Sequence, residues 1–356
     1  MKHLKQLFHN PVTILVGVGL IFVLVTVHGI PYAVAMHQNY SKVATTTLIA
    51  KILPPSKPTL DTKLFDRQLE RMANYASTTA TTSRMWPVKT EYPKAGAILP
   101  MKRIVAYYGN FYSTKMGILG EFDEATVIAR LKSEVARWEA ADPDTKVVPA
   151  IDYIATTAQQ HAQADGTYRL RMPDAHIQRA IDMARKIDGI TVLEIQAGLA
   201  SLQGEIVAFE EYLIQPDVHL AIDPEFNMKG GEEPGTVIGT VSAGDINRAS
   251  AYLAELVQKH DLPPKILVVH RFTQRMVTDY ALIETRPEVQ IVIVMDGWGP
   301  PAKKINTYKH FVAPEPIEFT GFKIFYKNDM KPPSDRLLTP QDLLKLTPRP
   351  MYIQYQ

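Results

Sequence analysis

Short apolar runs alternate with helical patterns from Lys102 to the end of the chain, and this alternation constrains the fold most. Eight runs are rich in β-branched or apolar residues, as strands are: Arg103–Tyr108, Lys146–Ile151, Gly189–Ile195, Val218–Ile222, Lys265–Val269, Val289–Met295, Gly321–Tyr326 and Met351–Tyr355. Such a repeat predicts an α/β protein with a closed (β/α)8 barrel, a TIM barrel. The alternative is an open α/β sheet with a second domain, but no Gly-x-Gly-x-x-Gly follows a strand to favour dinucleotide binding.

Helices are predicted between these strands by apolar residues at helical spacing and by capping residues such as Ser242 and Thr339. The predicted ranges are Asp123–Ala140, Asp174–Lys186, Ser201–Leu213, Ser242–His260, Thr273–Ile283, Ala302–Phe311 and Thr339–Leu346. No helix is predicted after the last strand. We expect a helix at Leu60–Ala76 to cover that gap or the barrel floor, so the barrel domain is predicted to span 60–356.

The first part of the chain has the pattern of a membrane-targeting segment. Residues 1–10 carry lysines, whereas 11–36 have no Lys, Arg, Asp or Glu and include an apolar run about long enough to span a bilayer. The positive-inside rule then predicts a cytoplasmic segment at 1–10, a transmembrane signal anchor at 11–36 and an extracytoplasmic linker at 37–59. Ala33-Val34-Ala35 leaves a second possibility, cleavage near Ala35 and secretion.

Composition excludes several other classes of protein. The formal charge of +2 is small and Lys and Arg form no run, so nothing indicates a nucleic-acid partner. Cysteine is absent, which excludes disulfides, thiolate metal sites and a cysteine nucleophile. Any metal would need oxygen or imidazole ligands. We expect the chain to act as a monomer.

Polar and acidic residues end nearly every predicted strand, where the active sites of such barrels lie. They are Tyr108, Asn110, Asp152, Glu194, Gln196, Asp223, Glu225, His270, Arg271, Asp296, Trp298, Tyr326 and Lys327. Because strand side chains alternate, Asp152 and Asp223 follow the small residues Ala150 and Ala221 on one face, which suits the crowded barrel interior. We expect the acids to converge on one pocket; the alternative is a solvated rim.

Asp223 and Glu225 form the central acid pair. Like charges this close raise the pKa of one carboxyl, which gives an acid and a base near neutral pH, and glycosidases use such pairs. We predict Glu225 as the general acid, Asp223 as its partner and Asp296 as a stabiliser of developing positive charge. The alternative is a pair of exposed loop acids around a proline turn.

The other strand-end residues are predicted to bind substrate. Asn110, Gln196, His270 and Tyr326 would contact hydroxyl or acetamido groups. Tyr108 is among the aromatic residues that could stack on a sugar ring, and Trp298 is the best candidate for this role. The remaining predicted binding residues are Asp152, Glu194, Arg271 and Lys327.

Asp223-Pro224-Glu225 resembles the D-x-E signature at the fourth strand of chitinase-type (family 18) and lysozyme-type (family 25) glycoside hydrolase barrels. Met295-Asp296 is similar to the Met-x-Tyr-Asp motif of the chitinase type, without its Tyr. The resemblance implies that Glu225 is the general acid and that Asp223 orients an N-acetyl group acting as nucleophile. The chain lacks the longer D-x-x-D-x-D-x-E pattern and has a proline between the two acids. More widely, it resembles bacterial secreted or lipoprotein-type barrel domains.

The leading interpretation is a membrane-tethered, extracytoplasmic glycoside hydrolase that acts on a cell-wall or extracellular polysaccharide and needs no cofactor. Two alternatives stay open. A metal-dependent hydrolase or isomerase would bind a divalent metal through Glu194, Asp223, His270 and Asp296. A non-catalytic barrel would bind a glycan or a partner, with Arg271 and Lys327 neutralising the acids.

Overall fold

The computed structural model describes residues 59–76 and 81–356. The predicted cytoplasmic segment, signal anchor and all but the end of the linker therefore lie outside the described residues. Among the residues that are described, no helix is long and apolar enough to cross a membrane.

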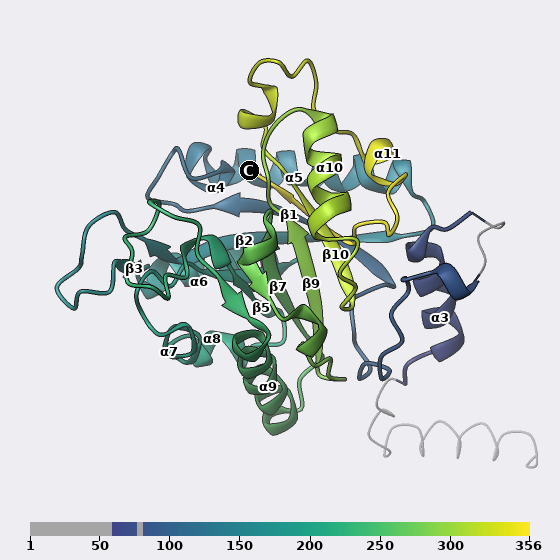
Figure 1. Ribbon diagram of the computed structural model, residues 1–356, viewed down its shortest axis with the longest axis horizontal. Coiled ribbons are helices and arrows are strands. Elements are labelled where there is room, and N and C mark those ends of the chain that lie inside the picture. The colour runs from purple at the N-terminus through teal and green to yellow at the C-terminus, as the bar shows by residue number, and fades with distance from the viewer. Residues whose placement is uncertain (1–58, 77–80) are drawn as a thin grey trace, which may run out of the picture. The chain divides into compact units, whose positions relative to one another are not determined.

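Within residues 59–76 and 81–356, eight parallel strands close into the predicted barrel (Figure 1). The sheet is closed because β1 pairs with both β2 and β11, so the open-sheet alternative is wrong. A short ninth strand, β3 (Arg169–Arg171), pairs antiparallel with the end of β2. The barrel strands are β1 (Lys102–Gly109), β2 (Lys146–Ala158), β4 (Ile190–Ile195), β5 (Val218–Ile222), β7 (Lys265–Arg271), β9 (Val289–Met295), β10 (Phe319–Ile324) and β11 (Tyr352–Tyr355).

Helices surround these strands much as the sequence predicts (Figure 1). The capping boxes at Ser242 and Thr339 are both formed, which sets where α9 and α11 begin. The predicted helix at 201–213 is divided into two short ones, and a short helix, α4, was not predicted. The helices are α4 (Ile118–Glu121), α5 (Glu124–Ala141), α6 (Asp174–Arg185), α7 (Leu202–Val207), α8 (Glu210–Leu213), α9 (Ala243–His260), α10 (Pro301–Phe311) and α11 (Pro340–Leu343).

The predicted helix at 273–283 is wrong. The segment consists of two single turns, η3 (Gln274–Met276) and η4 (Tyr280–Leu282), around a short strand, β8 (Val277–Thr278), which pairs with β6 (Val241–Ser242). The buried guanidinium of Arg271 takes the carbonyls of residues 273, 274 and 277, which a helix would need for its own hydrogen bonds. Asp279 has a left-handed backbone, which also stops a helix.

The helix predicted before the first strand is present as α3 (Thr62–Ala73), and it covers the barrel floor. Met72 and Ala73 pack in one cluster with inward-facing residues near the amino ends of the strands, such as Ile104 and Ile266. Gln290, the second residue of β9, holds the loop that leads into β1, because its side-chain oxygen accepts the Leu99 N–H at 3.0 Å. Since the floor is closed, a ligand can reach the barrel interior only from the carboxyl ends of the strands.

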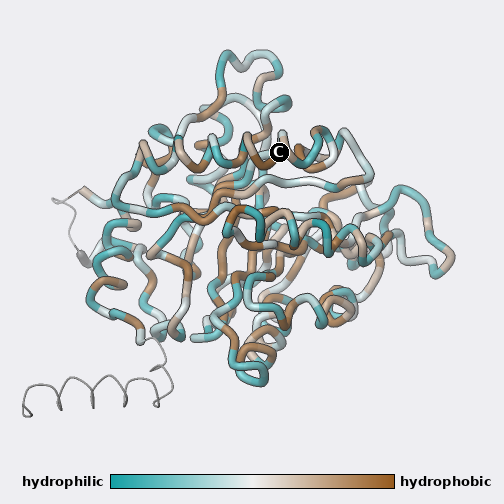
Figure 2. The backbone as a smooth tube through the Cα atoms, turned by 180° about the vertical axis from the view of Figure 1, so that it is seen from behind, coloured by the Kyte–Doolittle hydropathy of each residue, from teal (hydrophilic) through white to brown (hydrophobic). Residues whose placement is uncertain are grey.

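Apolar side chains fill both the lower barrel interior and the layer between strands and helices. On β1, for example, Ile104 and Ala106 point inward, whereas Val105 and Tyr107 pack toward the helices. Figure 2 shows hydrophobic segments in the central strands and hydrophilic ones in the outlying loops. The buried charged residues Glu194, His270 and Lys323 lie toward the carboxyl ends of their strands, at the barrel mouth.

Replacing Gly321 by alanine is expected to destabilise the barrel. A Cβ atom at Gly321 on β10 would lie 2.6 Å from Val294 Cγ2 and 2.8 Å from the Tyr352 carbonyl oxygen. We expect Gly321→Ala to lower the free energy of unfolding by about 1–3 kcal/mol, because the tight interior must shift. The matched control is Gly204→Ala in α7, where the nearest atom would be 3.5 Å away. Equal stability of the two variants in urea unfolding would contradict this account.

Candidate active site

Inward-facing side chains from five strands meet at the barrel mouth. The Tyr108 hydroxyl donates a hydrogen bond to Glu194 Oε1 at 2.7 Å. His270 lies between two carboxylates, with Nδ1 2.7 Å from Asp296 Oδ2 and Nε2 3.0 Å from Glu194 Oε2. Tyr108, Glu194, His270 and Asp296 are all buried. The alternation of strand side chains therefore brings these predicted residues together as expected.

Lys323 on β10 is part of this group and was missed by the sequence prediction. Its Nζ lies 3.2 Å from Asp296 Oδ1 and 3.8 Å from the centre of the Tyr108 ring. The signal was present in the sequence, because Lys323 follows Gly321 by two residues and therefore faces inward with it. Lys323 was not predicted because the candidate site residues were those at the ends of the strands, and this lysine is nearer the middle of the predicted strand Gly321–Tyr326.

Positive charges on both sides keep Asp296 ionised. Burial alone would raise the pKa of Asp296, but Lys323 and His270 outweigh it and hold that pKa below its ordinary value. Burial likewise opposes charge on His270, yet Glu194 and Asp296 raise the pKa of the imidazole well above the ordinary value. The pKa of Lys323 is also raised, because the nearby carboxylates outweigh the effect of its burial.

The Asp223–Glu225 pair lies on a turn rather than on a strand. β5 ends at Ile222, and Pro224–Phe226 form a single helical turn, η2. Asp223 caps this turn, since its Oδ1 accepts the Glu225 N–H at 3.0 Å, and the Gln196 amide lies 3.3 Å from its Oδ2. The strand geometry assumed for this pair was incorrect, yet both carboxyls line one cavity.

Both carboxyls of this pair bind protons more tightly than ordinary acids. Burial, with a further contribution from the charge of Asp296, raises the pKa of Glu225 to about 7. Burial and the charge of Glu194 raise the pKa of Asp223 well above its ordinary value. The barrel mouth therefore places an ionised acid, Asp296, opposite two acids that retain protons toward neutral pH.

A cavity of about 510 Å³ opens above these groups. Its wall contains three acids, three lysines, three uncharged polar side chains and five aromatic rings, including Asp223, Glu225, Asp296, Lys323, Gln196, Tyr108 and Trp298. Trp298 is 49% exposed, and Lys303 Nζ lies 5.1 Å from the centre of its ring. The volume and the mixture of aromatic and polar walls are typical of a small-ligand site.

Seven of the ten predicted binding residues do not line this cavity; three of them lie deeper in the barrel, and the other four have partners elsewhere. Arg271 faces the helices and pairs with Glu315. Asn110 is occupied with the backbone, since its amide donates to the Ile154 carbonyl at 3.0 Å. Tyr326 and Lys327 line a neighbouring cavity of about 340 Å³ instead.

The contacts of Tyr326 and Lys327 explain this placement. The Tyr326 hydroxyl donates to Glu134 Oε1 at 2.8 Å, because β10 ends at Ile324 and Tyr326 lies in the turn that follows. Lys327 pairs with Glu121 at 2.7 Å. Neither Arg271 nor Lys327 therefore neutralises the acids of the barrel mouth; among the described side chains, Lys323 pairs with Asp296 directly.

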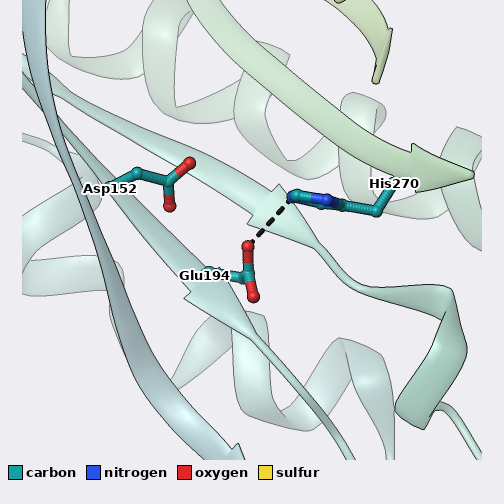
Figure 3. A group of neighbouring side chains, drawn as sticks. All are labelled: Asp152, Glu194 and His270. Atoms are coloured by element: carbon teal, nitrogen blue, oxygen red, sulfur yellow. Dashed lines mark ion pairs between the residues drawn. The ribbon is translucent and has the colours of Figure 1, made fainter. Parts of the chain in front are cut away.

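Asp152 lies deeper than the cavity wall. Its Oδ2 accepts hydrogen bonds from the Tyr352 hydroxyl at 2.6 Å and from the Gln354 amide. Figure 3 shows Asp152 facing Glu194 and His270. Of the four residues predicted as a metal set, Glu194 and His270 thus belong to a group with Asp152 whose ligand atoms lie within 4.8 Å of one another.

The fold and the site define a (β/α)8 barrel with a partly buried acidic cavity at its mouth. No protein-family model matches the chain, and no curated protein matches its sequence. Among solved structures, the cellulose synthase subunit Z of Clostridioides difficile is 10% identical, with 72% of this chain and 91% of that chain covered and a TM-score of 0.38.

Two further solved structures are similar to the same low degree. A Bacillus subtilis mannanase is 13% identical, with 72% of this chain and 80% of that chain covered and a TM-score of 0.37. A xyloglucan-specific endo-β-1,4-glucanase from a metagenomic library is 10% identical, with 69% of this chain and 81% of that chain covered and a TM-score of 0.36. Similarity at this level does not indicate a shared activity, nor a place in the family 18 or family 25 hydrolases.

Replacing Glu225 by glutamine is expected to stabilise the fold at alkaline pH. The folded-state pKa is about 7, above the ordinary value of about 4.3, so ionisation destabilises the folded state as pH rises through this interval. We expect Glu225→Gln to gain about 1–2 kcal/mol at pH 8, after allowance for its partial exposure, and little at pH 4.5. The control is Glu232→Gln on an exposed loop. The measurement is urea unfolding at both pH values. An increase in the free energy of unfolding that is the same at pH 4.5 and pH 8 would contradict the prediction.

Proposed function

We propose that this protein is a glycoside hydrolase of polysaccharides with Glu225 as its general acid. The position of Glu225 carries the proposal, because this carboxyl lines the cavity and its pKa is raised to about 7. At neutral pH a large fraction of Glu225 therefore holds a proton that it can give to a glycosidic oxygen.

Asp296 has the complementary role. It stays ionised between Lys323 and His270 and lines the same cavity, so it would stabilise the positive charge that develops at the anomeric carbon. Asp223, with its raised pKa, and Gln196 would hydrogen-bond to substrate hydroxyl or acetamido groups. The D-x-E resemblance to the chitinase type implies the same role for Asp223.

The reaction balances with one water per bond cleaved. Glu225 transfers its proton to the glycosidic oxygen as the bond between that oxygen and the anomeric carbon breaks. The oxygen of a water then bonds to the anomeric carbon, and a proton of this water restores Glu225. Trp298, half exposed at the cavity edge, offers an aromatic face to a sugar ring of the polymer.

The non-catalytic alternative is less well supported. A barrel that only binds a glycan needs no carboxyl with a pKa near neutrality in its cavity. The cations named for that alternative, Arg271 and Lys327, pair with Glu315 and Glu121 away from the acids.

We also propose that the barrel works outside the cytoplasmic membrane, tethered through residues 11–36. The uncharged apolar stretch after a basic segment supports this orientation. Protease added to intact spheroplasts should then digest the barrel. Full protection of the barrel, with digestion only after lysis, would rule out this orientation.

The catalytic role of Glu225 is tested with the full-length chain in detergent and a panel of insoluble and soluble polysaccharides. We expect release of reducing ends from at least one glycan, and a loss of about 10²–10⁴-fold in rate for Glu225→Gln with glycan binding retained. Because the protonated acid is the active form, the wild-type rate should fall as pH rises above about 7.

The control for this experiment is Glu232→Gln, which should keep the wild-type rate because Glu232 lies on an exposed loop. Undiminished turnover by the Glu225→Gln variant would exclude Glu225 as the general acid. Glycan binding without release of reducing ends by the wild-type chain would instead establish the non-catalytic barrel.

A further inference from the structure

Three fully buried side chains from three of the barrel strands face a common point below the cavity. They are Asp152 on β2, Glu194 on β4 and His270 on β7, each with no exposed surface (Figure 3). One ligand atom from each of them lies within 4.8 Å of the other two. None of the three lines the cavity proposed for the glycan, so this is a separate and deeper site.

The atoms that face this point lack hydrogen-bond partners. Asp152 Oδ1, Glu194 Oε2 and His270 Nε2 are each buried without a hydrogen-bond partner. Glu194 Oε2 and His270 Nε2 form an ion pair at 3.0 Å, so among the described residues Asp152 Oδ1 is the atom of the three that pairs with nothing. A buried polar atom without a partner costs about 1–3 kcal/mol, so Asp152 Oδ1 facing this ion pair indicates a missing occupant.

The opposite atom of each side chain is firmly held. Glu194 Oε1 accepts the Tyr108 hydroxyl at 2.7 Å, and Asp152 Oδ2 accepts the Tyr352 hydroxyl at 2.6 Å. His270 Nδ1 lies 2.7 Å from Asp296 Oδ2, to which it donates because the carboxylate can only accept. A bound cation would displace the proton from Nε2 and take its lone pair as a ligand, while Nδ1 keeps its proton toward Asp296. Metal-binding histidines typically have such a carboxylate partner on the second nitrogen.

Charge favours a cation at the same point. Around this point lie the acids Asp152, Glu194 and Asp296, whereas the cationic side chains in contact with them are His270 and Lys323. One imidazole nitrogen with two carboxylate oxygens is a donor set that suits first-row transition ions better than Mg²⁺ or Ca²⁺.

We propose that Asp152, Glu194 and His270 bind one divalent transition-metal ion of the Zn²⁺ or Mn²⁺ type. The ion has three protein ligands, and Tyr108, Tyr352 and Asp296 orient them. Bound there, it balances the buried carboxylates and fixes His270, and through His270 it positions Asp296 in the cavity wall. The proposal does not depend on the glycosidase activity, because its evidence is the geometry of the ligand atoms.

The test is calorimetric titration of full-length, untagged protein in detergent, after removal of metal by a chelator. We expect one Zn²⁺ or Mn²⁺ per chain, much weaker Mg²⁺ binding, and a rise in melting temperature with added Zn²⁺. Asp152→Asn and Glu194→Gln should each weaken Zn²⁺ binding by about 100-fold or more and abolish the thermal shift. The matched control is Glu318→Gln, a buried acid that accepts the Ile291 N–H at 2.7 Å, which should bind Zn²⁺ like the wild type.

The competing outcome is that Zn²⁺ binds to surface histidines. The Zn²⁺ affinity would then be unchanged in Asp152→Asn and Glu194→Gln, and this result would overturn the proposal. Failure of the wild-type chain to bind a stoichiometric ion also overturns it. Circular dichroism checks that the variants fold. X-ray absorption of the wild-type zinc form does not depend on the variants, and it should show a first shell of nitrogen and oxygen at about 2.0–2.1 Å. A first shell of histidine nitrogens alone would contradict the assignment.

Discussion

The pairing of Asp296 with Lys323 and His270 is the interaction on which the barrel mouth depends. Taking charged groups out of water costs several kcal/mol per ion, and each buried charge must be offset by partners at close range. Lys323 Nζ lies 3.2 Å from Asp296 Oδ1, and His270 Nδ1 lies 2.7 Å from Asp296 Oδ2. Both oxygens of this carboxylate are thus neutralised, so Asp296 stays ionised where an unpaired acid would take up a proton.

This neutralisation separates the acids into two kinds. Asp296 has strong cationic partners, and its pKa is lowered. Among the described side chains, no cation contacts Glu225 or Asp223 directly, and burial together with neighbouring carboxylates raises their pKa values. The same chemical group is therefore ionised after β9 and protonated on the turn after β5, which is the division of roles that the proposed cleavage of a glycosidic bond requires.

Much of this arrangement was predictable from the sequence because barrel strands are continuous apolar runs and their side chains alternate. The eight runs predicted the strands, and the small residue Ala150 marked the inward face of β2 that carries Asp152. Lys323 was not predicted because it lies near the middle of its predicted strand, and Tyr326 was predicted to bind substrate although β10 ends two residues before it.

Other features depend on contacts that a local pattern does not contain. The segment after Arg271 has helical spacing, but the arginine takes its carbonyls and a short strand pairing replaces the helix. Similarly, Asp223 and Glu225 were read as strand neighbours, whereas the proline between them starts a helical turn that Asp223 caps. That these two carboxyls still share a cavity follows from the position of the turn above the barrel, not from strand alternation.

The lower half of the barrel is what allows the upper half to hold so many polar groups. Gly321 leaves room for Tyr352, whose Cβ would be 3.1 Å from a Cβ added at position 321. The Tyr352 hydroxyl then reaches up to anchor Asp152. An apolar floor sealed by α3 excludes water from below, so each carboxylate must find its partners among the side chains of the mouth. The small residues of the interior thereby determine the electrostatics of the site, because they decide which tyrosine, lysine or histidine can reach which acid.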